Sequence, residues 1–149
     1  MSIVLTVEDT PSPDDLRVIQ DGLTRHALPM TRVPGFQRVA VLARDARATL
    51  VGGAVGAVNW TWLHVALLWV SEAHRHTGLG TRLMDELEDI GVRRGCRHAH
   101  LDTFSYQAQP FYERRGYRVF ATLADYPPGH QRIFMEKTLA TRAASAGPR

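Results

Sequence analysis

The amino-acid sequence predicts an α+β fold, in which helices flank a mixed, mostly antiparallel sheet of six to seven strands. Three observations lead to this prediction. Several short segments alternate apolar and polar residues with a period of two, two longer segments carry apolar residues at helical spacing, and the two kinds of segment follow one another without an internal repeat. A chain of 149 residues is expected to form one domain that buries roughly two thirds of its unfolded surface.

Composition favours a soluble, cytoplasmic protein. The formal net charge is +3, and Cys96 is the only cysteine, so no internal disulfide can form. No charged segment followed by an apolar one stands at the start, as a secretory leader would require. Residues 48–70 lack charge over a length that could cross a bilayer, but Asn59, Thr61 and His64 interrupt them, which favours two short strands. The arginines are scattered, so nucleic-acid binding is not expected as the main role.

The first 35 residues predict a strand, a helix and a loop. Residues 3–8 place apolar side chains on one face, as in a half-buried strand. Ser12 is a suitable N-cap and Pro13 suits the first helical position, so a helix begins there and is expected to end within residues 26–29. Residues 30–35 include a Pro-Gly pair and are expected to form a loop.

Three strands are expected next. Residues 37–43 and 49–58 read as an antiparallel pair joined by a turn at residues 44–47. Residues 62–70 are apolar on both faces, as expected of a central strand. Strict alternation would place one set of side chains of this strand on a single face: Trp62, His64, Ala66, Leu68 and Val70.

An amphipathic helix is expected to start at Leu79 and to stop at Gly95. Its apolar stripe includes Leu83 and Leu87, and its acidic residues, Glu88 among them, are expected on the outside. The remainder predicts a strand at 98–104, a short helix at 109–115 and a hairpin of strands at 117–121 and 132–137. We therefore expect one domain over residues 1–140 and a frayed tail at 141–149.

A glycine-containing turn between the central strand and this helix forms the first motif, Arg75-x-x-Gly78-x-Gly80. Glycine lets the backbone approach a ligand closely, and the free N–H groups at a helix start carry a positive partial charge. A diphosphate suits such a turn, although a turn of this kind also occurs simply for packing. The spacing matches neither the dinucleotide pattern nor the P-loop pattern.

A second motif lies thirty residues further on, and it contains Ala108, Phe111, Tyr112, Gly116 and Tyr117. With the first motif and the order of elements, it resembles the GNAT superfamily of acyl-CoA-dependent N-acyltransferases over nearly the whole chain. The family pattern starts with Asn where this chain has Ser105, which puts a side-chain contact to pantetheine in doubt.

The resemblance implies roles for particular residues. Backbone groups of Leu68 and Val70 would meet the pantetheine arm of acetyl-CoA, and Ser105 stands at a further pantetheine position. Tyr112 would protonate the leaving thiolate, unless it only packs beneath the loop. The cradle for the diphosphate would be formed by Arg75, His76, Thr77, Gly78, Leu79, Gly80 and Thr81.

Acyl transfer to an amine needs a base, because deprotonating an alkyl ammonium of pKa about 10.4 at pH 7 costs on the order of 4.6 kcal/mol. Family members often carry a carboxylate on the central strand where this chain has His64. Imidazole is a competent base at neutral pH, so His64 is either the base or water-orienting group, or a buried histidine satisfied by its neighbours. The candidate acceptor contacts are Trp62, Asp125, Tyr126 and His130, the last three in a loop that walls the acceptor site in the family.

These residues predict an N-acetyltransferase in which a primary amine of a small molecule or peptide attacks acetyl-CoA directly. The alternatives are a non-catalytic acyl-CoA-binding module and a related transferase that uses another acyl donor, such as aminoacyl-tRNA. No metal is expected, since the His-x-His pairs lack a third ligand. The family resemblance also suggests a homodimer.

Overall fold

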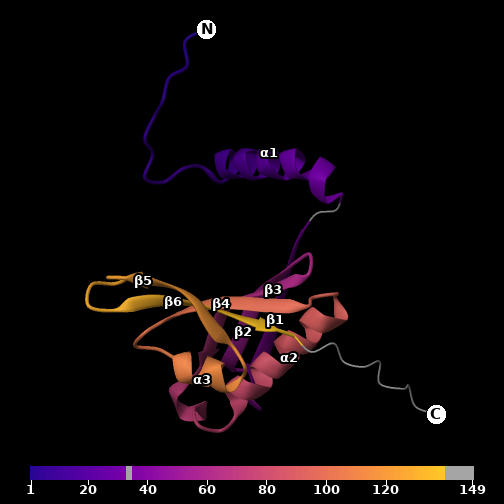
Figure 1. Cartoon of the computed structure of the whole chain (residues 1–149), viewed down its shortest axis with the longest axis vertical. Coiled ribbons are helices and arrows are strands. Elements are labelled where there is room, and N and C mark those ends of the chain that lie inside the picture. The colour runs from indigo at the N-terminus through magenta and orange to yellow at the C-terminus, as the bar shows by residue number, and fades with distance from the viewer. Residues whose placement is uncertain (33–34, 140–149) are drawn as a thin grey trace, which may run out of the picture. The chain divides into compact units, whose positions relative to one another are not determined.

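The computed structural model describes residues 1–32 and 35–139. The chain forms two compact units, Met1–Gly35 and Phe36–Arg149, and each is described by itself. The predicted single domain over residues 1–140 stays a prediction, and the predicted tail at 141–149 lies outside the described residues. The elements in chain order are α1 (Pro13–Thr31), β1 (Phe36–Arg44), β2 (Leu50–Asn59), β3 (Trp62–Val70), a 3₁₀ turn (Glu72–His74), α2 (Leu79–Arg93), β4 (His98–Phe104), α3 (Gln109–Arg114), β5 (Arg118–Ala124) and β6 (Gln131–Thr138) (Figure 1).

The first unit contains helix α1 and no strand among its described residues. Ser12 caps the helix as predicted, since its side chain accepts a hydrogen bond from the Asp15 N–H at 3.0 Å. The strand predicted at residues 3–8 is wrong, because a strand needs a hydrogen-bonded neighbour and only a helix accompanies this segment in its unit. The helix also runs past Pro29 and ends when Arg32 adopts φ 66°, so Met30 is helical instead of lying in the predicted loop.

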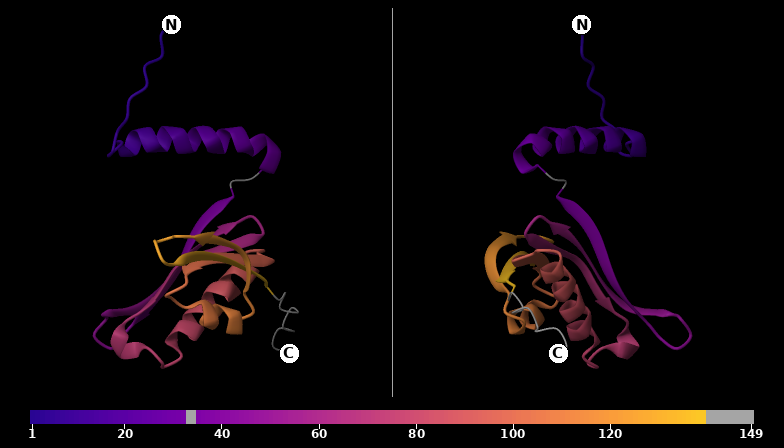
Figure 2. Two further views of the ribbon diagram at one scale, coloured as in Figure 1. Left: turned by 60° about the vertical axis from the view of Figure 1, so that its left-hand side comes forward. Right: turned by 90° about the vertical axis from the view of Figure 1, so that its right-hand side faces the viewer.

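The second unit contains a six-stranded sheet in the order β1-β2-β3-β4-β6-β5. All neighbouring strands are antiparallel except β3 and β4, which are parallel. This arrangement confirms the predicted fold class. Helices α2 and α3 pack against the same face of the sheet (Figure 2) and share one apolar core with it. The largest fully buried side chains in that core are Leu63, Met84, Leu87, Leu101 and Met135.

Strand β3 contains a β-bulge that changes which side chains share a face. Val55 of β2 pairs with Leu67, whereas the next residue, Gly56, pairs with Val65, so Ala66 is the extra residue. Beyond the bulge, Leu68 packs against the core on the same side as Val65. The predicted alternation is therefore wrong after Val65, because one inserted residue exchanges the two faces.

The bulge depends on a glycine in the neighbouring strand. A Cβ atom at Gly56 would lie 2.5 Å from the backbone oxygen of His64, closer than real Cβ contacts come. Only a residue without a side chain lets β2 and β3 approach this closely at the bulge. Gly56 thus sets the path of the strand that leads to the functional site.

Candidate functional site

Strands β3 and β4 separate at their carboxyl ends. Their parallel ladder has four pairs, from Trp62–His98 to Val65–Leu101, yet β3 continues to Val70 and β4 to Phe104. Backbone groups of β3 on this side are therefore left without a ladder partner in the described chain. Such groups can bind an extended ligand in the manner of an added strand.

A cleft of about 750 Å³ occupies the space beyond the ladder. It brings together the two motifs that lie thirty residues apart in the sequence. Its lining includes Leu68 and Val70 of β3, the turn and start of α2, and Thr103 of β4. The remaining wall comes from the second motif: Tyr106, Gln107, Ala108, Phe111, Tyr112 and Arg114.

The turn before α2 has the geometry of an anion cradle. Gly78 is the N-cap residue at φ 83°, and no side chain caps the helix. The first N–H groups of α2 lack intrahelical acceptors, and they lie at the positive end of the helix dipole. Arg75, which also lines the cleft, holds its Nε 3.3 Å from the Val70 carbonyl oxygen and adds positive charge. These groups can bind a diphosphate.

Two of the sequence-predicted cofactor residues lie outside the cleft lining. The Thr77 hydroxyl donates to the His74 carbonyl at 2.5 Å, and Thr77 lines a neighbouring cavity. The Ser105 hydroxyl accepts a hydrogen bond from the Gln131 N–H at 3.0 Å, and the Ser105 N–H donates to the Gln131 carbonyl at 2.9 Å. Both hydroxyls thus have partners within the protein.

Tyr112 is buried at the wall of the cleft. Its ring lies edge-on to those of Phe111 and Tyr117, with centroids 5.2 and 5.9 Å away. Burial raises the pKa of the Tyr112 phenol above its usual value, so the phenol keeps its proton at neutral pH. A protonated phenol at this wall can serve as a proton donor.

His64 and Trp62 lie on the sheet face opposite the helices and do not line the cleft. The His64 ring stacks on His100 of β4, with centroids 4.6 Å apart. The Trp62 ring stacks on His98 of β4, with centroids also 4.6 Å apart. This second pair lies two residues further from the point where the strands separate. Neither histidine of β4 was a predicted site residue, because their meeting with β3 depends on strand order and register.

Two of the four predicted acceptor residues, Asp125 and Tyr126, line a second cavity of about 400 Å³ together with Phe104, Tyr106 and Pro127. Trp62, at the start of β3, does not line it. Tyr106 lines this cavity and the cleft, which places the two side by side. The His130 ring meets Tyr106 edge-on, with centroids 4.9 Å apart.

Arg132 was missed by sequence reasoning, and it ties strand β4 to the acceptor loop. Its Nε donates to Asp102 at 2.9 Å, and its Nη1 donates to the Tyr126 hydroxyl at 3.0 Å. The guanidinium also lies over the Tyr126 ring, 5.0 Å from the centroid. No local pattern in the sequence pairs Asp102 with Arg132, which stand 30 residues apart.

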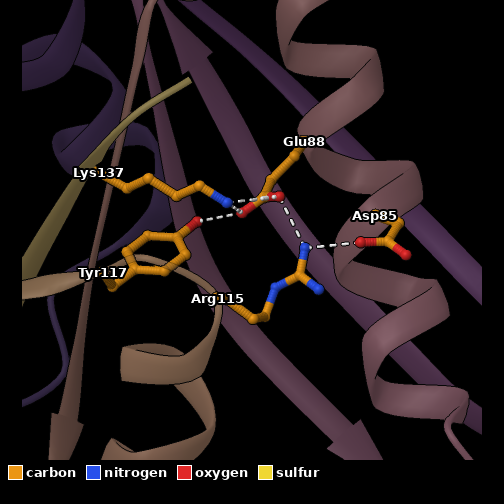
Figure 3. Close-up of polar contacts among 5 residues, drawn as sticks. All are labelled: Asp85, Glu88, Arg115, Tyr117 and Lys137. Carbon is orange, nitrogen blue, oxygen red and sulfur yellow. Dashed lines mark hydrogen bonds and ion pairs between the residues drawn. The ribbon is translucent and has the colours of Figure 1, made fainter. Parts of the chain in front are cut away.

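Glu88 of α2 is buried, so its predicted outside position is wrong. Figure 3 shows its carboxylate among three donors: Arg115 Nη2 at 2.7 Å, the Tyr117 hydroxyl at 2.8 Å and Lys137 Nζ at 3.2 Å. Burial and the Glu88 charge together raise the pKa of Tyr117 far above its usual range. These contacts hold α2 against the segment after α3 and against β6. Helix α2 and helix α3, which directly precedes that segment, both line the cleft.

The comparisons with known proteins agree with this geometry. Residues 11–117 match the Acetyltransferase (GNAT) family. The chain belongs to the GNAT family. It is 41% identical over 125 residues to blasticidin-S acetyltransferase of Streptomyces morookaense, an alignment that covers 83% of this chain and 87% of that protein. It is a GNAT-family N-acetyltransferase.

Solved acetyltransferase structures share the fold. A crystal structure of an acetyltransferase from Bacillus cereus superposes with a TM-score of 0.76 at 30% identity, covering 90% of this chain and 98% of that one. An aminoglycoside 6'-N-acetyltransferase crystallised with coenzyme A superposes with a TM-score of 0.63 at 22% identity, covering 94% and 99% of the two chains.

Two further features of this GNAT chain concern metals and membranes. Within residues 1–32 and 35–139, no three His, Cys, Asp or Glu side chains are grouped so that they could hold a metal ion. No helix in the same part of the chain is both long and apolar enough to cross a membrane.

Proposed function

We propose that this acetyltransferase transfers the acetyl group of acetyl-CoA to a primary amine of a small antibiotic-like or amino-acid-like molecule by direct attack. The cleft that joins the two motifs carries this proposal. It offers backbone groups of β3 that have no ladder partner in β4, an anion cradle at the start of α2 and a protonated phenol at its wall. The likeness to blasticidin-S acetyltransferase supports an antibiotic-like acceptor.

The cofactor would lie along the cleft from the cradle toward the point where the strands separate. The amides of residues 78–81 and the Arg75 side chain would hold its diphosphate. Backbone groups of Leu68 and Val70 would hold the pantetheine arm. Gly80 lies on this path, and a Cβ atom there would point between Phe111 and Val70, at ordinary contact distances of 3.8 and 3.9 Å.

The acceptor would approach along the second cavity, where Asp125, Tyr126 and His130 gather around Tyr106. Asp125 suits a cationic part of the acceptor, and the aromatic rings suit a planar or apolar part. Trp62 lies further along β3 and would contact only a long acceptor.

In the reaction, the amine nitrogen bonds to the thioester carbon and the C–S bond breaks. Two protons leave the nitrogen of the original ammonium ion. His64 takes one, directly or through a water, and passes it to solvent. The second proton replaces the one that Tyr112 gives to the departing thiolate, so Tyr112 ends the cycle protonated and one proton is released to solvent per turnover.

A thiol-release assay tests the proposal, with acetyl-CoA and a panel of amines that includes blasticidin S and free amino acids. We expect release with at least one small amine, and losses in kcat of about 10²-fold or more for His64→Ala and Tyr112→Phe, typical of a lost acid or base. Both variants should keep the rise in Tm that acetyl-CoA causes. Full turnover by both variants, or no release with any amine, would contradict the proposal.

A further inference from the structure

Two imidazole rings lie face to face on neighbouring strands. His64 of β3 and His100 of β4 are direct partners in the parallel ladder, and their ring planes differ by 13° with centroids 4.6 Å apart. Residues paired in this way project on the same side of a sheet. The stack therefore follows from strand register and does not require a loop to hold it.

The pair lies at the point where the strands separate. The ladder ends one rung later, at Val65–Leu101, and those two side chains are buried toward the helices. His64–His100 is thus the last pair of the ladder on the opposite face. The His64 and His100 rings therefore lie next to the opening between β3 and β4, toward which the pantetheine arm of the cofactor would point.

The carboxylates that face this pair already have cationic partners. Glu136 of β6 is the register partner of His100, and it forms an ion pair with Arg118 of β5. Asp102, two residues along β4, forms an ion pair with Arg132 of β6 at 2.9 Å.

Among the described strand residues beside the pair, the other titratable or charged groups carry no negative charge. His98 lies two residues before His100 on β4, on the same face. On the other side of His64, its partner in the antiparallel ladder is Ala57 of β2, and the partner of Ala57 is Arg38 of β1. The described part of the sheet therefore offers no unpaired anion next to the stacked rings to stabilise a second positive charge on them.

Burial and proximity act in the same direction on one ring. Burial lowers the pKa of His100, a positive charge on His64 lowers it further, and Asp102 opposes these effects in part. His100 thus stays neutral at a pH of about 6.5, where a free histidine ring takes up a proton. A neutral ring stacked on a protonated one is also electrostatically favourable, whereas two protonated rings would repel each other.

We propose that His100 is the positioning residue for the base: its neutral imidazole, stacked on His64, fixes the plane of the ring that takes the acceptor's proton and limits the pair to one proton. This inference rests on the role proposed above for His64. The proton balance is unchanged, since His64 still passes the proton to solvent. His100 neither gains nor loses a proton during turnover.

An NMR titration of the histidine rings in the full chain tests the coupling without any substrate. We expect the His100 ring to titrate below the value of free imidazole in the wild-type protein. In His64→Phe, which keeps a flat ring in the stack but removes its charge, the His100 midpoint should move upward. An unchanged His100 midpoint in His64→Phe would overturn the proposal.

Kinetics of two His100 variants test the positioning role. His100→Ala removes the stack, and we expect its kcat to fall about tenfold or more, with little change in the KM for acetyl-CoA. The loss in kcat should be only a part of the rate enhancement that a general base supplies. His100→Phe restores a neutral ring and should recover most of that loss. His98→Ala is the matched control, since it removes the neighbouring stack on Trp62 from the same strand and face, and it should not reproduce the loss.

Equal losses in His100→Ala and His100→Phe, or a loss in His100→Ala no larger than in His98→Ala, would overturn the positioning role. The two proposals can fail separately. Absence of thiol release by the wild-type protein contradicts the proposed function, whereas the NMR titration still decides whether the two rings share one charge. Melting temperatures of all variants show whether each retains its fold.

Discussion

The two glycines of the cradle have different physical roles. Gly78 adopts φ 83°, a conformation that costs other residues roughly 1–2 kcal/mol, although a Cβ atom there would meet nothing within 4 Å. Gly80 is helical, and it leaves space in the cleft between the side chains of Phe111 and Val70. Gly78 shapes the turn, and Gly80 marks the position from which a longer side chain would enter the cleft.

Lengthening the side chain at position 80 should therefore weaken cofactor binding in steps. A Cβ atom at Gly80 makes only ordinary contacts of 3.8–3.9 Å, so Gly80→Ala should have a small effect on the Kd for acetyl-CoA. Gly80→Leu adds a branched group within the cleft and should raise the Kd about tenfold or more, equivalent to about 1.4 kcal/mol. Calorimetric titration measures both, and equal Kd values for Gly80→Leu and the wild-type protein would contradict the proposed path of the cofactor.

At the scale of elements, the bulge in β3 links the fold to the site. It returns Leu68 and Val70 to the core side after Val65, and it lies beside the residue proposed as the base. Gly56 of β2 makes the bulge possible, because any side chain there would collide with the His64 backbone. A glycine in one strand thus controls the position of a histidine in the next.

Gly56→Ala should accordingly destabilise the sheet and impair turnover together. The added methyl group would lie 2.5 Å from the His64 carbonyl oxygen, so the backbone must shift, and we expect a loss of roughly 1–3 kcal/mol in the free energy of unfolding. Gly53→Ala on the same strand is the control, since its nearest contact is the flexible end of Leu42 at 3.2 Å. Urea unfolding compares the midpoints of Gly56→Ala and Gly53→Ala, and equal midpoints would show that the close approach of the strands at Gly56 is unimportant.

At the scale of the whole folded unit, the Glu88 cluster joins segments that are distant in the sequence. One carboxylate binds Arg115, which follows α3, together with Tyr117 and Lys137 of β6 (Figure 3). Both helices that line the cleft are thereby held relative to the sheet. The cluster therefore supports the site, although Glu88 itself does not line the cleft.

Removing this carboxylate should cost far more than removing its exposed neighbour. Glu88→Ala leaves Arg115 and Lys137 without their shared buried anion, and we expect a loss of about 3–5 kcal/mol in the free energy of unfolding. Asp85 also contacts Arg115 at 2.8 Å, but its side chain is 58% exposed, so Asp85→Ala should cost at most about 1 kcal/mol. Denaturant titration of both variants measures the difference, and similar losses would mean that Glu88 is not the centre of the cluster.

Local sequence patterns were sufficient for several features of the second unit. They predicted the full extent of β3 and β4, the start of α2 and the Gly95 stop, because periodicity, caps and turns depend on residues within a few positions of one another. The two motifs that line the cleft were also visible in the sequence. The strand at residues 3–8 failed because alternation alone does not supply a neighbouring strand.

Other features depended on tertiary structure. The bulge at Ala66, the burial of Glu88, the link between Ser105 and Gln131, and the stacking of His64 on His100 each require partners from distant segments. Such contacts are set by strand order, register and the distance between strands, which no local pattern encodes. The sequence alone therefore determined the family and the residues available for catalysis, and the packing of distant segments decided which of them meet.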